Sequence, residues 1–264
     1  MPSGIICVVI LLFSAFVSGV SGFGFTMVAL TLLSLLYDIK TSVVFLAIHT
    51  LTCNIFQLVK LRNHLYIKGM LPLLAGALTG VPAGVYILKN IDPWWIKKSL
   101  GVVIITFVIQ QFFYSGKTEN TDSPTQNGAG GNGEPVPPLN GSGENKKKTL
   151  PGFLAGTAGG ALMGSLLSGG PPIAIYALKE SQNKYYIKAT LQSFFLFSSL
   201  YSIIIYFATG LMTAPLLLSS LLYLPATIVG TGLGILVFEK ISFATFNKIV
   251  LAFITMLGLS LLLK

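Results

Sequence analysis

The chain alternates between apolar segments and short polar breaks, and its apolar segments fall into two length classes. Two short runs come first, at 4–20 and 23–37, and three longer segments follow at about 41–61, 67–88 and 94–114. Because a helix needs roughly 20 residues to cross about 30 Å of hydrocarbon, the long segments predict transmembrane helices. The short pair predicts either a re-entrant hairpin or two tilted crossings that are broken where they meet.

The second part of the chain repeats this pattern. Short runs occur at 150–167 and 171–178, and long ones at about 187–209, 214–238 and 243–263. Single residues recur as well: Gly80 and Gly84 return as Gly230 and Gly234. This weak similarity between halves is typical of the internal repeats of transporters.

The composition changes completely between the two halves, at 116–149. Gly, Asn, Pro, Ser and charged residues replace the apolar ones, which predicts a disordered linker. The expected organisation is therefore a first repeat at 1–115, the linker at 116–149 and a second repeat at 150–264. Each half has an odd number of crossings, counted either as five segments or as three crossings plus a re-entrant pair. The predicted fold is thus an all-α polytopic membrane protein with two inverted repeats.

The composition excludes a soluble globular protein. Hydrophobic residues make up 53% of the chain and charged residues 9%, whereas soluble domains carry about 25% charged residues. The net charge of +9 does not indicate nucleic-acid binding, because the basic residues flank apolar spans or crowd one loop. Cys7 and Cys53 lie in different apolar segments without a CxxC motif or a His cluster, so we expect no disulfide, no metal site and no cofactor.

The distribution of basic residues predicts the orientation in the membrane. One side carries Lys60, Arg62, Lys68, the linker lysines, Lys179, Lys184, Lys188, Lys240 and Lys248. The other side carries Lys40, Lys89, Lys97, Lys98 and Lys264. The positive-inside rule makes the richer side cytoplasmic, which places the linker in the cytoplasm and both termini outside.

Two polar breaks, at 18–25 and 165–172, interrupt the short helix pairs and form the candidate binding site. Non-helical backbone at membrane depth survives only where protein or a water-filled cavity satisfies its peptide groups. In an inverted repeat, the helices that begin near Phe23 and Gly170 would point their N-termini into one cavity, where unpaired N–H groups and the helix dipole attract an anion. The predicted substrate-binding residues are Ser18, Ser21, Gly22, Phe23, Gly24, Ser165, Ser168, Gly169, Gly170, Pro171 and Gln192.

The segments contain no Lys or Arg near their centres, so the expected ligand is an oxyanion held by neutral donors. The alternative interpretation of the breaks is that glycine and serine only allow helices to pack closely.

His49 is the candidate coupling residue. It lies near the middle of an apolar segment, where an ionisable side chain is costly against lipid, and it can exchange a proton near neutral pH. The alternative is a neutral imidazole that is hydrogen-bonded to a carbonyl of a neighbouring helix. The remaining polar candidates, as ligands or as contacts between helices, are Asn54, Gln57, Thr190, Gln192 and Ser193.

Three motifs resemble those of a known protein family. They are the broken short helix pair in each half, the Gly-Gly-Pro-Pro element that ends at Pro172, and the recurring glycine pairs. With these motifs the chain resembles the sulfite exporter TauE/SafE family of membrane permeases over nearly all of its length except the linker. The resemblance implies a secondary transporter, generally an exporter, of small sulfur-containing or organic anions such as sulfite or sulfonates.

Three functional classes compete at this point. An anion transporter with alternating access at the repeat interface, with protons as a candidate coupling ion, accounts for the duplication and for the paired breaks. A passive anion channel would use the same breaks but would conduct without saturation or coupling. An intramembrane enzyme would need a nucleophile or an acid–base pair, and the sequence has no HExxH, no GxSxG and no paired aspartates, so we expect no enzyme.

Overall fold

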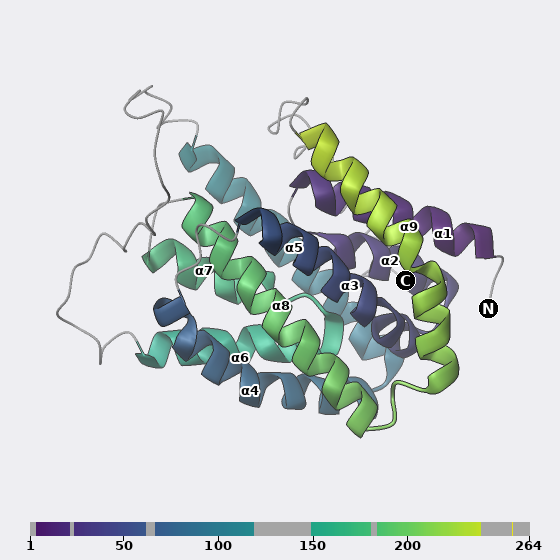
Figure 1. Cartoon of the computed structure of the whole chain (residues 1–264). Coiled ribbons are helices and arrows are strands. Elements are labelled where there is room, and N and C mark those ends of the chain that lie inside the picture. The colour runs from purple at the N-terminus through teal and green to yellow at the C-terminus, as the bar shows by residue number, and fades with distance from the viewer. Residues whose placement is uncertain are drawn as a thin grey trace.

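A computed structural model describes residues 4–21, 24–61, 67–118, 149–180, 184–238 and Thr255. The first half contributes the helices α1 (Gly4–Ser21), α2 (Phe25–Leu36), α3 (Ile39–Leu61), α4 (Ile67–Asn90) and α5 (Pro93–Thr118). The second half contributes α6 (Thr149–Leu166), α7 (Gly170–Glu180), α8 (Lys184–Ala208) and α9 (Ala214–Phe238). Every regular element within these ranges is a helix, which confirms the all-α prediction (Figure 1).

Four of the described helices are long and apolar enough to cross a membrane. They are Ile39–Val59, Met70–Asn90, Ala189–Ala208 and Ala214–Val237. The predicted segment at 243–263 lies outside the described residues except for Thr255, and so does most of the linker. The helix α5 continues to Thr118, beyond its expected end at 114. The structure therefore has the helices of a multi-pass membrane protein.

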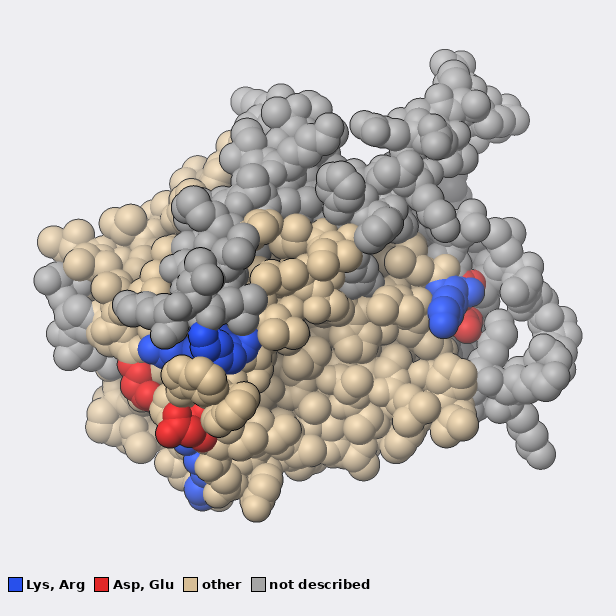
Figure 2. All heavy atoms as spheres, turned by 180° about the vertical axis from the view of Figure 1, so that it is seen from behind, with Lys and Arg blue, Asp and Glu red and all other residues tan. Residues whose placement is uncertain are grey.

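The charged side chains that the structure describes lie at two ends of the molecule. Figure 2 shows blue and red groups on opposite sides of a wide uncharged band. At one end, the Lys40 ammonium donates to the Lys89 carbonyl at 2.9 Å and the Lys89 ammonium donates to the Thr209 carbonyl at 3.0 Å. Large apolar side chains such as Leu222, 73% exposed, lie on the surface of the described helices. We expect lipid tails to contact this uncharged, apolar band.

The helices α4 and α6 pack backbone to backbone. Gly76, Gly80 and Gly84 recur every fourth residue along α4, and each lies against the α6 backbone, in order at Phe153, Thr157 and Ala161. Residues four apart share one face of a helix, and the absence of side chains on this face allows the close approach. The contacts advance in the same direction along both helices, so α4 and α6 are parallel (Figure 1).

The helices α1 and α9 form a second close pair. Gly230 lies against the Leu12 carbonyl, and Gly234 lies against Phe16 and Gly19. This pair is also parallel, and like α4 with α6 it joins one helix from each half of the chain. Figure 1 shows α9 bent along its length, and Pro225 inside the helix gives a physical reason, because proline removes a backbone hydrogen bond.

The centre of the molecule is formed by α2 and α3. Nearly every residue of α2 from Phe25 to Ser34 is buried, and α3 packs against α2, α8 and α9. One apolar cluster includes Val17 and Phe25, on either side of the first break, and Leu166 and Leu167 at the second. Both breaks therefore adjoin a single core.

Candidate functional site

The first break lies between α1 and α2. The helix α1 ends at Ser21, and Gly24 precedes α2 with a φ of 90°, a left-handed conformation that favours glycine. This geometry explains why the chain needs a glycine immediately before the second helix. Gly22, Phe23 and the side chain of Ser21 lie outside the described residues.

The second break contains Leu167, Ser168 and Gly169. Leu167 has a φ of 52°, and its N–H donates to the Met163 carbonyl at 3.0 Å, while the Ser168 N–H donates to the Leu162 carbonyl at 3.3 Å. A leucine in the left-handed region is strained by roughly 1–2 kcal/mol. The break is therefore held by hydrogen bonds back to α6.

The second break has fewer free donors than its sequence suggests. The Ser165 hydroxyl, a predicted ligand, donates to the Ala161 carbonyl at 2.7 Å. The helix α7 begins at Gly170 and continues with Pro171 and Pro172, and proline has no N–H. Two of the four N–H groups that a helix start normally exposes are thus missing here.

A buried chain of hydrogen bonds joins the first break to α8. Gln57 of α3 donates from Nε2 to the Ser18 hydroxyl of α1 at 2.9 Å, and Gln192 of α8 donates from Nε2 to Gln57 Oε1 at 2.6 Å. All three side chains are buried. Two predicted ligands, Ser18 and Gln192, are therefore brought together by Gln57, which connects both halves of the chain.

His49 lies in a polar seam between α3 and α9. Its Nδ1 is 2.8 Å from the Thr227 hydroxyl, and one turn further along, Cys53 Sγ is 3.3 Å from the Thr231 hydroxyl. The side chain of His49 is 0% exposed, and the Phe45 ring packs 5.0 Å from it. Within the described ranges, His49 Nε2 has no hydrogen-bond partner. The expected interior location of His49 is therefore observed.

The adjacent face of α3 contacts the start of α2. The Thr50 and Thr26 hydroxyls are 3.1 Å apart. Asn54, one turn after Thr50, is buried, and its Nδ2 has no partner among the residues that the structure covers. Hydroxyl and amide groups of Thr50, Asn54 and Gln57 thus follow one another along this face of α3.

Sequence reasoning missed the partners of His49 and Cys53. Thr227 and Thr231 lie four residues apart, as His49 and Cys53 do, and this matched spacing on two apolar helices is the signal that was available. The spacing alone does not say which two helices pack together.

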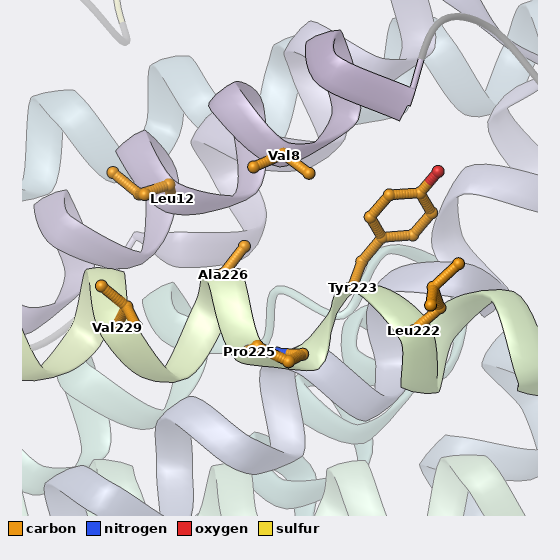
Figure 3. Close-up of a pocket in the computed structure, with 7 residues that line it drawn as sticks. All are labelled: Val8, Leu12, Leu222, Tyr223, Pro225, Ala226 and Val229. Carbon is orange, nitrogen blue, oxygen red and sulfur yellow. The ribbon is translucent and has the colours of Figure 1, made fainter.

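A shallow groove of about 310 Å³ lies between α1 and α9 (Figure 3). It is lined by Val8, Leu12, Leu222, Tyr223, Pro225, Ala226 and Val229, and Figure 3 shows these side chains around the proline of α9. None of the predicted site residues lines it. Its apolar walls and exposed Leu222 suit contact with lipid better than an anion.

Comparison with known proteins gives one positive result. The family model described as sulfite exporter TauE/SafE matches residues 6–261. No curated protein and no solved structure matches the chain. Because the family model spans nearly the whole sequence, the chain belongs to the sulfite exporter TauE/SafE family.

Proposed function

We propose that the protein is a secondary transporter that exports small sulfur-containing or organic anions, such as sulfite or sulfonates, with alternating access at the interface of two inverted repeats. Family membership indicates a membrane transporter of sulfite or a related anion rather than an enzyme. The observation that carries the proposal is the buried polar face of α3, where Gln57 and Asn54 lie beside the first break.

The inverted arrangement is supported by the directions of the helices. In addition to the two glycine-packed pairs, α3 runs parallel to α9, because His49 and Cys53 pair in order with Thr227 and Thr231. The helices α4 and α8 are also parallel, since Leu78 meets Tyr201 and Lys89 meets Thr209. A short turn reverses the chain between α8 and α9 (Figure 1). Corresponding helices of the two halves then point in opposite directions.

The chemistry of the centre favours an anion that neutral groups bind and release. Within the four candidate spans, the lysines are Lys40 and Lys89, and both lie at span ends rather than near the centre. A buried ion pair would hold an anion tightly, whereas amide and hydroxyl donors leave no fixed countercharge. Such a site suits a carrier that must release its substrate on each cycle.

We further propose that His49 couples transport to protons. The nearby titratable groups are Cys53 on α3 and Tyr223 on α9, both neutral when protonated, and a ring contact of 6.0 Å links Tyr223 to Phe45. A proton on His49 would be costly at this depth without a negative partner. A bound anion would supply that partner, so proton and anion would favour each other's binding.

The proposed orientation places the linker in the cytoplasm and both termini outside. It is supported by the grouping of Lys40 and Lys89 with the Thr209 end of α8, on the side that we expect to face outward.

Flux measurements with the purified chain in liposomes test this function. Sulfite and sulfoacetate uptake are measured with and without an imposed pH gradient, for wild type, His49→Ala and Ser168→Ala. Ser219→Ala is the matched control, because the Ser219 hydroxyl donates to its own helix at an exposed position. We expect saturable flux that follows the gradient in wild type and in the control, and falls in the other two variants.

The possible results separate the competing functions. Flux without saturation or gradient dependence would indicate a channel. If the His49→Ala variant shows saturable flux that still follows the pH gradient as in wild type, the coupling role of His49 is refuted. Absence of flux for both anions would refute the proposed substrate class.

A further inference from the structure

The start of α2 is buried and has no side-chain cap. Gly24 supplies no capping hydrogen bond, and the first-turn residues Phe25, Thr26 and Met27 are all buried. The first N–H groups of any helix have no partner within the helix itself. A buried helix start of this kind needs an acceptor from elsewhere, and the positive end of the helix dipole favours an anion.

Asn54 lies beside this helix start. Thr50, one turn before Asn54, contacts Thr26 in the first turn of α2. Gln57, three residues after Asn54, contacts Ser18 near the end of α1. Because residues three and four apart share a helix face, Asn54 stands between the contacts that α3 makes with the two sides of the break.

The Asn54 amide nitrogen is a buried donor without an acceptor. Asn54 is 6% exposed, and its Nδ2 makes no hydrogen bond within the described ranges. Leaving a buried donor without an acceptor destabilises the folded state, because the group has lost its hydrogen bonds to water. Buried donors without a partner are rare in folded proteins, and a bound ion, a ligand or an ordered water usually satisfies them.

The start of α7 offers fewer backbone donors than the start of α2. Pro171 and Pro172 remove N–H groups from the start of α7, and the Ser165 hydroxyl donates to its own helix. The two helix starts therefore differ in the number of backbone donors that they can offer to an anion.

We propose that Asn54 is a substrate-binding residue, which donates from Nδ2 to one oxygen of an oxyanion whose other oxygens accept from the N-terminus of α2. The start of α2 thus holds most of the negative charge, and Ser168 at the second break remains a proposed secondary contact. This inference rests on the proposed transport function and specifies the residue that recognises its substrate. An anion with several oxygens can satisfy these separate donors together.

Calorimetric titration of the purified full chain with sulfite and with methanesulfonate tests the inference. The variants are Asn54→Leu, which removes the donor at similar volume, and Asn54→Asp, which replaces it with an acceptor. Ser202→Ala is the control, because Ser202 is another buried polar side chain whose oxygen has no partner in the described structure, located on α8. Thermal unfolding of each variant without ligand is measured alongside.

We expect Asn54→Leu to weaken binding of both anions by about 10- to 100-fold, the effect of losing a hydrogen bond to a charged group. Asn54→Asp weakens it further through repulsion, and Ser202→Ala leaves it unchanged. Asn54→Leu does not lower the unfolding midpoint of the empty protein, because it removes a donor that had no partner. If Asn54→Leu does not fold, Asn54→Asp, which has the same shape, decides the question.

Two results would overturn the role of Asn54 while transport itself stands: unchanged affinity in both Asn54 variants, or a midpoint that drops by several degrees with affinity intact. The second result would make Asn54 a contact between helices. If wild type neither binds nor transports either anion, the transport proposal fails first and the Asn54 role fails with it.

Discussion

Replacing Gly80 with alanine tests whether backbone contact between α4 and α6 holds the structure together. A Cβ at this position would lie 2.9 Å from both the Cα and the carbonyl carbon of Thr157, and nearer still to the Thr157 oxygen. Carbon atoms pack best at about 3.5–4.0 Å, so the two helices must separate by about 0.6 Å or more. The obstacle is backbone, which cannot rotate away as a side chain could.

The magnitude follows from two opposing effects. Alanine is favoured over glycine in a helix interior by about 1 kcal/mol, and overpacking a tight interface costs typically about 1–3 kcal/mol. Gly232→Ala in α9 is the matched control, because a Cβ there meets nothing within 4 Å. The Gly232→Ala variant therefore gains the higher helix propensity of alanine without a steric clash. We expect Gly80→Ala to be less stable than Gly232→Ala by the full overpacking cost.

The assay is thermal unfolding of both variants in the same detergent, followed by size-exclusion chromatography of the heated samples. For a chain of this size, about 1 kcal/mol shifts the midpoint by roughly 2–4 °C. The midpoint of Gly80→Ala should fall below that of wild type, and that of Gly232→Ala should equal or exceed it. Equal midpoints for the two variants would refute close backbone packing of α4 on α6.

Two further changes probe the first break and its hydrogen bonds. Gly24→Ala should lower the unfolding midpoint by the equivalent of about 1–2 kcal/mol, because the φ of 90° is costly for alanine. Gly24→Asn should lower the midpoint less, because asparagine tolerates the left-handed conformation better. Equal effects of the two variants would contradict a left-handed conformation at Gly24. The second test is a double-mutant cycle of Gln57→Leu and Gln192→Leu, measured by unfolding in mixed detergent. We expect a coupling energy of about 0.6–1.7 kcal/mol for the 2.6 Å hydrogen bond between the two side chains. Strictly additive effects would show that this bond contributes nothing to stability.

Local features of the fold follow from the sequence because apolar run length and helix-breaking residues act locally. The segments expected at 41–61 and 214–238 correspond to Ile39–Leu61 and Ala214–Phe238, and both glycine breaks separate helices where expected. The extension of α5 to Thr118 was missed, since a polar C-terminal turn carries no apolar signal.

Helix partnership could not be read from the same signals. The spacing of Gly76, Gly80 and Gly84 indicates a close approach, but any helix with a smooth face could be the partner. The pairing of His49 with Thr227 spans 178 positions and depends on how several helices pack at once. The buried and unpartnered amide of Asn54 likewise becomes visible only when its whole surroundings are known.

The pairing of α1 with α9 has a consequence for how the protein is made. The face of α1 that contains Leu12, Phe16 and Gly19 enters the membrane long before α9, the helix that covers it, leaves the ribosome. Until then lipid or a chaperone must occupy that face. A prematurely terminated first half would retain an uncovered helix, so we expect the cell's membrane proteases to remove it rather than let it accumulate.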